Sequence, residues 1–499
     1  MNKWNKKCQK SNSILRFAEV SDIFNISGGK NMASRMVRIE SVTIENFKNV
    51  SKGTLNFENK HKKYKSSILG LYGQNGSGKT ALIDAIQLLK YALCGNQIPK
   101  KYADYIQVDA EFATLKYELV VRYSEEEYKV WYQFSIKKVI DELASNIEDD
   151  SNTSVVTRAE LFDEVLSFSY KSNEQSLRKS PLIDTRAEKL FAPKGKLVEL
   201  VGKSKEQYMD LLVTKRLARA TSRSFVFSKE MMKQYRENCR NEMYMKLIEG
   251  LYTFAYRELF IIGTESIGLI SLNALPLVFK YRNDDSESVG RIVISLDGST
   301  LIPEKSYNLV EKVIENMNIV LEQLVPGLKI GVVDLGASMK KDGTVARQIQ
   351  LMSLKNSKQI PFCYESEGIK KIVSILQLLI VVYNNPSVTV AVDEIDGGVF
   401  EYLLGELLNI ISEKGKGQLI FTAHNLRPLE TIDKGFVAFT TTNMENRYIR
   451  LTNVKGTNNL RDFYYRDIVL GEQNEQVYNH TNNFEIALAF REAGEAFGS

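Results

Sequence analysis

The chain has 499 residues and a formal net charge of +5 at pH 7, a length that suits roughly two to four domains or one large domain with an insertion. Hydrophobic residues make up 43% and charged residues 25% of the sequence, which is typical of a soluble globular protein. The 4 cysteines are scattered and only 3 histidines occur, which excludes a disulfide scaffold and a histidine-built metal site. No apolar stretch is long enough to span a membrane and no secretion signal is visible, so we expect a cytoplasmic protein without a membrane partner.

The first 35 residues show no periodic pattern of apolar side chains, and the first strand pattern begins at Val37. We therefore predict that residues 1–35 are a disordered leader. Two methionines, Met32 and Met36, are alternative candidates for the natural start of the protein.

A glycine-rich loop follows an apolar strand expected at residues 68–72 and precedes a helical pattern. The loop consists of Gly73, Gln74, Asn75, Gly76, Ser77, Gly78, Lys79 and Thr80. Its glycines allow a tight turn, so that backbone N–H groups and the start of the helix converge on phosphate groups. In such a loop the Lys79 ammonium neutralises the β- and γ-phosphates, and the Thr80 hydroxyl is a ligand of Mg²⁺. The pattern predicts a site for ATP or GTP with Mg²⁺.

Residues 104–137 alternate between apolar and polar side chains, which predicts antiparallel strands, and the pattern becomes helical from about 181 to 264. Residues 186–240 hold 14 Lys and Arg against 6 Asp and Glu, a local excess of +8. The densest basic cluster consists of Lys215, Arg216, Arg219 and Arg223. A solvated helix face is the favoured interpretation, and a surface for nucleic acid or for an acidic protein is the alternative.

Two acidic residues end a buried strand far along the chain. The β-branched run at residues 387–392 predicts a parallel strand, which delivers Asp393 and Glu394 at its carboxyl end. Beside a phosphate-binding loop, Asp393 would complete the shell of Mg²⁺ and Glu394 would act as general base toward the attacking water. A helical pattern at residues 400–411 and a second strand at 418–423 follow, and that strand ends in His424. This spacing fits one strand–helix–strand unit, so we expect His424 beside the acids as a sensor of the γ-phosphate.

Upstream of these strands, Ser366 precedes a long helical pattern and is a good N-cap. The order of the motifs resembles the head domain of ABC-type ATPases. This resemblance implies an α/β fold with a mixed sheet, an antiparallel subdomain and a mainly helical insertion. It also implies that Ser366 and Gly368 belong to a signature motif that binds ATP, that Asp396 belongs to the D-loop and that His424 is the switch histidine. Glu367 departs from the glycine that transporters carry, and Gln97 and Gln107 are both candidates for the Q-loop glutamine.

Lys79 and Ser366 are separated by 287 positions, and this long separation resembles the Rad50/SMC/RecF branch of the superfamily. The chain is most similar there to the OLD and abortive-infection type of AAA ATPase, as in the ATPase subunit of PARIS-like anti-phage systems. On this resemblance we expect a head of two parts, residues 36–140 and 306–499. Between them, residues 141–305 are expected to form the mainly helical insertion with strands.

The resemblance further implies a slow ATPase that acts in a homo-oligomer, at least a head-to-head dimer with ATP between the subunits. Only 75 residues follow His424, too few for the nuclease domain of OLD-type proteins, so we expect a separate effector protein, a nuclease. The trigger would be nucleic acid or a phage protein. Two other functions fit the sequence, namely a DNA-repair ATPase of the RecF or Rad50 kind and a scaffold that binds ATP and hydrolyses it slowly.

Overall fold

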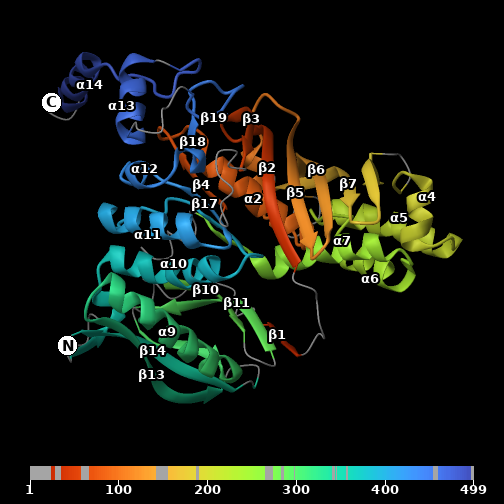
Figure 1. Ribbon diagram of the computed structural model, residues 1–499, viewed down its shortest axis with the longest axis horizontal. Coiled ribbons are helices and arrows are strands. Elements are labelled where there is room, and N and C mark those ends of the chain that lie inside the picture. Colours follow the sequence, from red (N-terminus) through yellow and green to blue (C-terminus); the bar gives the residue numbers. More distant parts are fainter. Residues whose placement is uncertain are drawn as a thin grey trace, which may run out of the picture.

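Figure 1 shows the computed structural model of the protein. It describes residues 24–27, 35–57, 67–141, 156–186, 190–263, 274–282, 286–296, 298–339, 343, 345–355, 358–452, 459–471 and 473–495. Most of the predicted disordered leader, residues 1–35, lies outside these described residues. Four residues of it, Phe24–Ser27, form strand β1, so at these positions the prediction of disorder is wrong. Strand β1 pairs with a strand far along the chain, which no local pattern indicates.

The central sheet has six strands in the order β19-β18-β4-β17-β16-β9. All neighbouring pairs are parallel except β18 with β19. Strands β16 to β18 are buried along their whole length, as expected of parallel strands covered on both faces. The strands are β4 (Ser67–Tyr72), β9 (Leu259–Ile262), β16 (Thr389–Val392), β17 (Gln418–Thr422), β18 (Val437–Thr440) and β19 (Tyr448–Ile449).

The helices of this part follow the phosphate loop and the later strands. They are α2 (Lys79–Leu93), α10 (Glu367–Asn384), α11 (Glu401–Lys414), α12 (Pro428–Thr431), α13 (Leu460–Leu470) and α14 (Asn483–Glu495). Helix α2 packs its apolar residues into one hydrophobic core with the antiparallel sheet described next, whereas α10 and α11 contribute to a second core on the other side of the central sheet. The central sheet therefore lies between two cores.

A second six-stranded sheet is antiparallel, in the order β3-β2-β5-β6-β7-β8. Alternating burial along its strands explains the alternating sequence pattern, because one face covers α2 and the other faces solvent. Its strands are β2 (Arg35–Phe47), β3 (Val50–Asn56), β5 (Phe112–Tyr123), β6 (Glu126–Ile140), β7 (Thr157–Lys171) and β8 (Ser176–Asp184). The expected α/β fold with a mixed sheet and an antiparallel subdomain is thus confirmed.

The segment 141–305, expected to be a mainly helical insertion, is divided among several units. Strands β7 and β8 extend the antiparallel sheet, and β9 forms the edge of the central sheet. Between them lie the helices α4 (Lys194–Val201), α5 (Lys205–Ala220), α6 (Lys229–Asn238) and α7 (Glu242–Thr253). We refer to residues 194–253 as the helical segment; Figure 1 shows it at the far end of the antiparallel sheet from α13 and α14.

Two small sheets complete the fold. One has the order β1-β11-β10, and the other has the order β12-β14-β13 with β15 paired to β14. Helix α9 (Glu304–Leu324) covers the second of these sheets. The strands are β10 (Ala274–Arg282), β11 (Ser286–Ser295), β12 (Thr300–Pro303), β13 (Leu328–Met339), β14 (Val345–Lys355) and β15 (Lys358–Pro361).

A buried glutamine, Gln418, links the two large sheets. The side-chain oxygen of Gln418, on β17, accepts a hydrogen bond from Ile39 N on β2 at 3.1 Å, and its amide donates to Ile39 O at 2.8 Å. The Thr389 hydroxyl of β16 donates to the same Gln418 oxygen. The side chain thus satisfies both the N–H and the C=O group of Ile39, as a neighbouring strand would do in a sheet.

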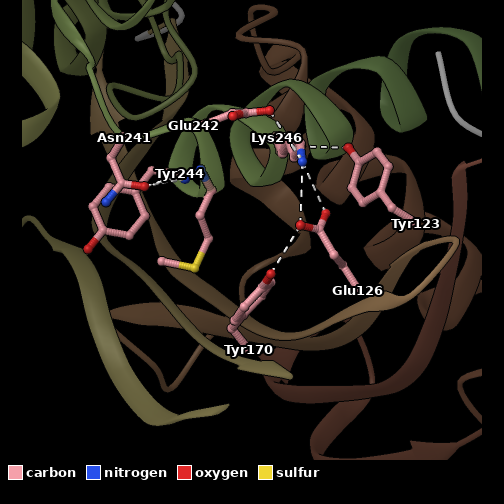
Figure 2. A network of polar contacts seen from close by, with 8 residues as sticks. Tyr123, Glu126, Tyr170, Asn241, Glu242, Tyr244 and Lys246 are labelled. Carbon is pink, nitrogen blue, oxygen red and sulfur yellow. Dashed lines mark hydrogen bonds and ion pairs between the residues drawn. The ribbon is translucent and has the colours of Figure 1, made fainter. Parts of the chain in front are cut away.

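Figure 2 shows how helix α7 is fastened to the hairpin of β5 and β6. The Lys246 ammonium lies 3.3 Å from Glu126 and from Glu242, and the Tyr170 hydroxyl donates to the same Glu126 carboxylate at 3.0 Å. The Tyr123 hydroxyl donates to the backbone oxygen of Lys246 at 2.8 Å. These contacts fix the helical segment against the sheet that covers the phosphate loop helix.

Glu164 is a second fastening and is buried. Its carboxylate accepts hydrogen bonds from the Tyr132 hydroxyl at 2.8 Å, from Phe225 N at 2.7 Å and from the Ser224 hydroxyl. Burial raises the pKa of this carboxyl, while the donors around it oppose that rise. The residue therefore ties β7 to the connection between α5 and α6.

We predict that Glu164→Ala lowers the free energy of unfolding by about 3 kcal/mol, because at least three buried donors lose their acceptor. The melting temperature would fall by about 3 °C, measured by thermal unfolding. Glu174→Ala, at an exposed turn, is the matched control and should change stability by less than about 0.5 kcal/mol. Equal melting temperatures for the two variants would contradict this role of Glu164.

Candidate active site

The phosphate loop and the acidic strand meet because β17 lies between β4 and β16, parallel to both. Parallel strands end at the same edge of a sheet, so residues after β4, β16 and β17 come together there. A cavity of about 300 Å³ opens at this edge. It is lined by Lys48, Asn49, Asn75, Gly76, Gly78, Lys79, Thr80, Ala81, Asp393, Glu394 and His424. The structure thus brings the predicted phosphate loop, acids and histidine around one cavity.

The loop needs its glycines. Gly73, Gly76 and Gly78 have φ angles of 147°, 73° and 95°, in a region that residues with a Cβ rarely adopt. A Cβ on Gly73 would also lie 1.8 Å from the Thr440 hydroxyl oxygen. Strand β18 therefore approaches the loop so closely that only glycine fits.

Lys79 is held inside the loop. Its ammonium donates to Gly73 O at 2.8 Å and to Gln74 O at 2.9 Å, and only 6% of the residue is exposed. Burial lowers the pKa of this ammonium, whereas the carboxylates of Asp393 and Glu394 raise it. The charge of Lys79 thus faces the acid pair across the cavity.

Thr422, at the end of β17, positions both acids. Its hydroxyl donates to Asp393 Oδ1 at 2.6 Å and accepts from Glu394 N at 2.8 Å. The Asp393 backbone N–H donates to Ile262 O of β9 at 2.8 Å. Glu394 has a φ of 46°, which is unusual for a residue with a side chain and stores strain at this position. Sequence reasoning missed Thr422, although a threonine ending the strand next to the acids is a usable signal.

Asp396 supports His424 from behind. Its Oδ2 atom accepts hydrogen bonds from the backbone N–H groups of His424 at 2.7 Å and of Asn425 at 2.6 Å. Asp396 does not line the cavity. In a single subunit it therefore fixes the turn that presents His424.

Ser366 and Gly368 also lie outside the cavity lining. Ser366 is the N-cap of α10, and its hydroxyl oxygen accepts from Ile369 N at 3.4 Å, as the sequence predicts for a cap. A Cβ on Gly368 would lie 2.2 Å from Gly398 O, so the start of α10 is packed against the turn after the acids. An ATP-binding role for these residues stays a prediction about contacts between subunits.

Lys48 and Asn49 line the cavity and were not predicted. Both lie in the turn between β2 and β3. The Lys48 ammonium pairs with Asp84 of α2, and the Asn49 side-chain amide donates to Gly76 O. A short turn gives no motif that indicates a role at a distant loop, so only the fold reveals them.

The phosphate loop is buttressed by residues from the end of the central sheet. The Tyr448 hydroxyl donates to Gly78 O at 2.9 Å, and the Ser77 and Thr440 hydroxyls are hydrogen bonded to each other. Arg447 donates to Asn49 O at 2.6 Å. Strands β18 and β19 thus hold the loop from outside the cavity.

The basic cluster in the helical segment does not form one surface. The Lys215 ammonium is buried and donates to Thr185 O at 2.9 Å and Leu190 O at 2.8 Å. Burial, with the nearby Arg219 charge, lowers its pKa to about 8. Arg223 donates to Gly95 O at 3.3 Å. Of the four residues of the cluster, only Arg216 is exposed, and Arg219 and Arg223 are half-buried.

The residues at the cavity fit Mg²⁺. This ion is bound by one or two carboxylates together with phosphate oxygens and water, and it prefers oxygen ligands. The Thr80 hydroxyl and the buried Asp393 carboxylate supply such oxygens at the cavity wall. No group of three or more His, Cys, Asp and Glu that could hold a metal occurs among the described residues.

Residues 41–250 match the family model of an AAA domain, and no curated protein matches the chain. The SMC head domain from Thermotoga maritima is 15% identical, with a TM-score of 0.33, over 83% of this chain and 99% of that chain. The Smc head domain with an extended coiled coil bound to the C-terminal domain of ScpA, derived from Pyrococcus furiosus, is 13% identical, with a TM-score of 0.37, over 83% and 96%. The recombination mediator protein RecF with ATP is 13% identical, with a TM-score of 0.35, over 84% and 100%.

At these identities and TM-scores, similarity to the solved structures does not indicate a function. The family match contains the phosphate loop and the strands around it. Residues 41–250 are thus similar to an AAA domain, and the phosphate loop within them borders the cavity at the edge of the parallel sheet. Among the described residues, no helix is both long and apolar enough to cross a membrane.

We predict that Gly73→Ala weakens ATP binding at least about tenfold, because the added methyl group meets Thr440 and forces the loop from its conformation. Isothermal titration calorimetry with ATP measures this effect. Gly195→Ala is the matched control, since nothing lies within 4 Å of its Cβ position. Unchanged ATP affinity in Gly73→Ala would show that the loop does not cradle phosphate in this conformation.

Proposed function

We propose that the protein binds and hydrolyses ATP at the cavity between the phosphate loop and the acid pair. The observation that carries this proposal is the arrangement of Lys79, Glu394 and His424 around one cavity, although these residues lie far apart in the sequence. Backbone N–H groups, a cation, oxygen ligands and a carboxylate base are the parts that phosphoryl transfer to water requires. No second catalytic arrangement is needed.

In this proposal the loop N–H groups and Lys79 bind the β- and γ-phosphates. Thr80 and Asp393 hold Mg²⁺, which when bound neutralises charge on the phosphates. Glu394 accepts a proton from the attacking water, and His424 contacts the γ-phosphate from the neighbouring strand. Thr422 fixes the acids before the nucleotide arrives, so little reorganisation remains for the reaction itself.

We predict that Glu394→Gln cuts the hydrolysis rate by about two orders of magnitude or more, because the general base is lost while the shape of the side chain stays. ATP affinity, measured by calorimetry, should change little. Lys79→Ala is the contrasting variant and should abolish ATP binding by removing the charge at the phosphates. If Glu394→Gln hydrolyses ATP like the wild type, the base lies elsewhere.

We predict that Thr422→Val lowers kcat about tenfold to a hundredfold, because the acids lose the hydroxyl that positions them. Since Thr422 does not line the cavity, the affinity for ATP should stay nearly constant. Thr422→Ser keeps the hydroxyl and should retain most of the activity. A steady-state ATPase assay tests both variants, and similar rates in both would argue against the positioning role.

At the level of the assembly, we propose a cytoplasmic homo-oligomer in which two heads face each other with ATP between them. Ser366, Gly368 and Asp396 of one subunit would then approach the nucleotide of the other. The exposed capped start of α10 supports this arrangement, because a helix N-terminus favours anions. Glu394→Gln should trap the assembled state, which light scattering with and without ATP would detect.

The biological role that we propose is control of a separate effector, a nuclease, in defence against phage, with nucleic acid or a phage protein as trigger. It rests on the resemblance of the motifs to the abortive-infection ATPases. A DNA-repair ATPase of the RecF kind is the alternative, and it predicts hydrolysis that DNA stimulates with a steep dependence on salt. The internal contacts of Lys215 and Arg223 favour the first role, because these two cations donate hydrogen bonds to backbone oxygens elsewhere in the same chain, Thr185 O and Gly95 O. Capture of a nuclease by the tagged protein, without stimulation by DNA, would separate the two.

A further inference from the structure

Helix α14 carries many apolar side chains that are exposed to solvent in the single chain. Every side chain described between residues 483 and 494 is exposed, including Ile486 at 42% and Phe490 at 76%. The Asn482 side chain caps the helix by accepting from Phe484 N at 3.1 Å, so the helix is locally well formed. A helix with this many apolar residues normally buries them against another element.

Helix α5 carries a second stripe of exposed apolar side chains. Met209, Val213 and Leu217 follow each other at intervals of four residues and are exposed to 57%, 56% and 58%. Residues four apart lie on one face of a helix and form the ridge that packs into the groove of a neighbouring helix. Helix α5 thus offers a partner surface of the same kind and of similar length.

The charges beside the two apolar faces are complementary. On α14 the face of Ile486, Ala489, Phe490 and Ala493 has Glu485 and Glu492 along one edge, at about 100° per residue. On α5 the stripe has Lys205, Arg216 and Arg219 along one edge and Asp210 along the other.

Only an antiparallel pairing of the two helices places the acidic edge of α14 beside the basic edge of α5. In that orientation, Glu485 meets the end of α5 that carries Arg216, and Glu492 meets the end that carries Lys205. In a parallel pairing, the acids of α14 would face the acids of α5, which is unfavourable.

The longer segments that contain α14 and α5 also carry opposite net charges. Residues 460–495, which include α13 and α14, contain 3 Arg and no Lys against 7 Asp and Glu. Residues 186–240, which include α4 to α6, carry the excess of +8. Figure 1 places α14 and α5 at opposite ends of the molecule, so the two helices of one chain do not meet.

We propose that α14 of one copy of the chain packs antiparallel on α5 of a second copy. The contact is head-to-tail, because the two surfaces differ, and repetition closes a ring or extends a filament. It needs no nucleotide, since neither helix touches the cavity. One helix pair is smaller than the usual stable interface, so the contact should be seen at protein concentrations on the order of 100 µM or when other contacts support it.

Light scattering coupled to size exclusion, without nucleotide, tests the pairing by exchange of charges. One variant carries Glu485→Lys and Glu492→Lys, and the other carries Lys205→Glu and Arg216→Glu. Wild type should have a mass above the 56.8 kDa of one chain, falling with added salt, and each variant alone should fall to that mass. A mixture of the two variants should recover the higher mass, because each α14 then faces an α5 of opposite charge.

Glu315→Lys with Glu413→Lys, at exposed positions on other helices, is the matched control for the change in net charge and should assemble like wild type. A monomeric wild type at these concentrations overturns the proposal. The proposal is also overturned if either charge-exchange variant, measured by itself, has the same mass as the wild type. Failure of the mixture to recover the higher mass also overturns it. This test is made without nucleotide, so its result does not depend on whether Lys79→Ala loses ATP binding. The proposed ATPase function and the proposed contact between α14 and α5 can therefore be disproved independently.

Discussion

The pairing of β4 with β17 is the constraint on which the functional part of this molecule depends. It places residues that follow position 72 beside residues that follow position 422, in the parallel register that gives both strands the same exit edge. A shift of one residue would turn each side chain of β17 to the opposite face, and Thr422 would then no longer reach Asp393. The register is reinforced by Gln418, whose amide is bonded to β2 of the other sheet.

The cavity is prepared by groups that do not line it. Thr422 sets the acids, Asp396 sets the turn of His424, and Tyr448 holds Gly78. The strained backbone of Glu394 persists because its N–H is held by the Thr422 hydroxyl. Such fixed polar contacts leave the reacting groups with little freedom, which is how a protein site lowers the cost of orienting its reactants.

Local motifs were enough to predict the phosphate loop, the acids and His424, because each follows a strand whose apolar pattern is legible. The meeting of these residues could also be predicted, since parallel strands share an edge. Lys48 could not, because its place at the cavity depends on the fold and no spacing encodes it. Thr422 was missed, although its position at the end of the strand beside the acids is a usable signal. The count of basic residues in the helical segment was misleading for a related reason: a charge such as that of Lys215 can turn inward and satisfy backbone carbonyls. Strand β1 was missed because its partner lies more than 250 positions away.

Both neighbours of β4 in the central sheet, β17 and β18, come from the last fifth of the chain. During synthesis, the ribosome therefore releases the phosphate loop and its apolar strand long before any strand that can pair with them. Until that point the strand has two open edges, and open apolar edges invite association with other chains. ATP cannot rescue such an intermediate by binding, because the walls of its site are not yet made. The growing chain consequently relies on the antiparallel sheet, which closes from local hairpins, to shelter α2 and β4 until the rest arrives.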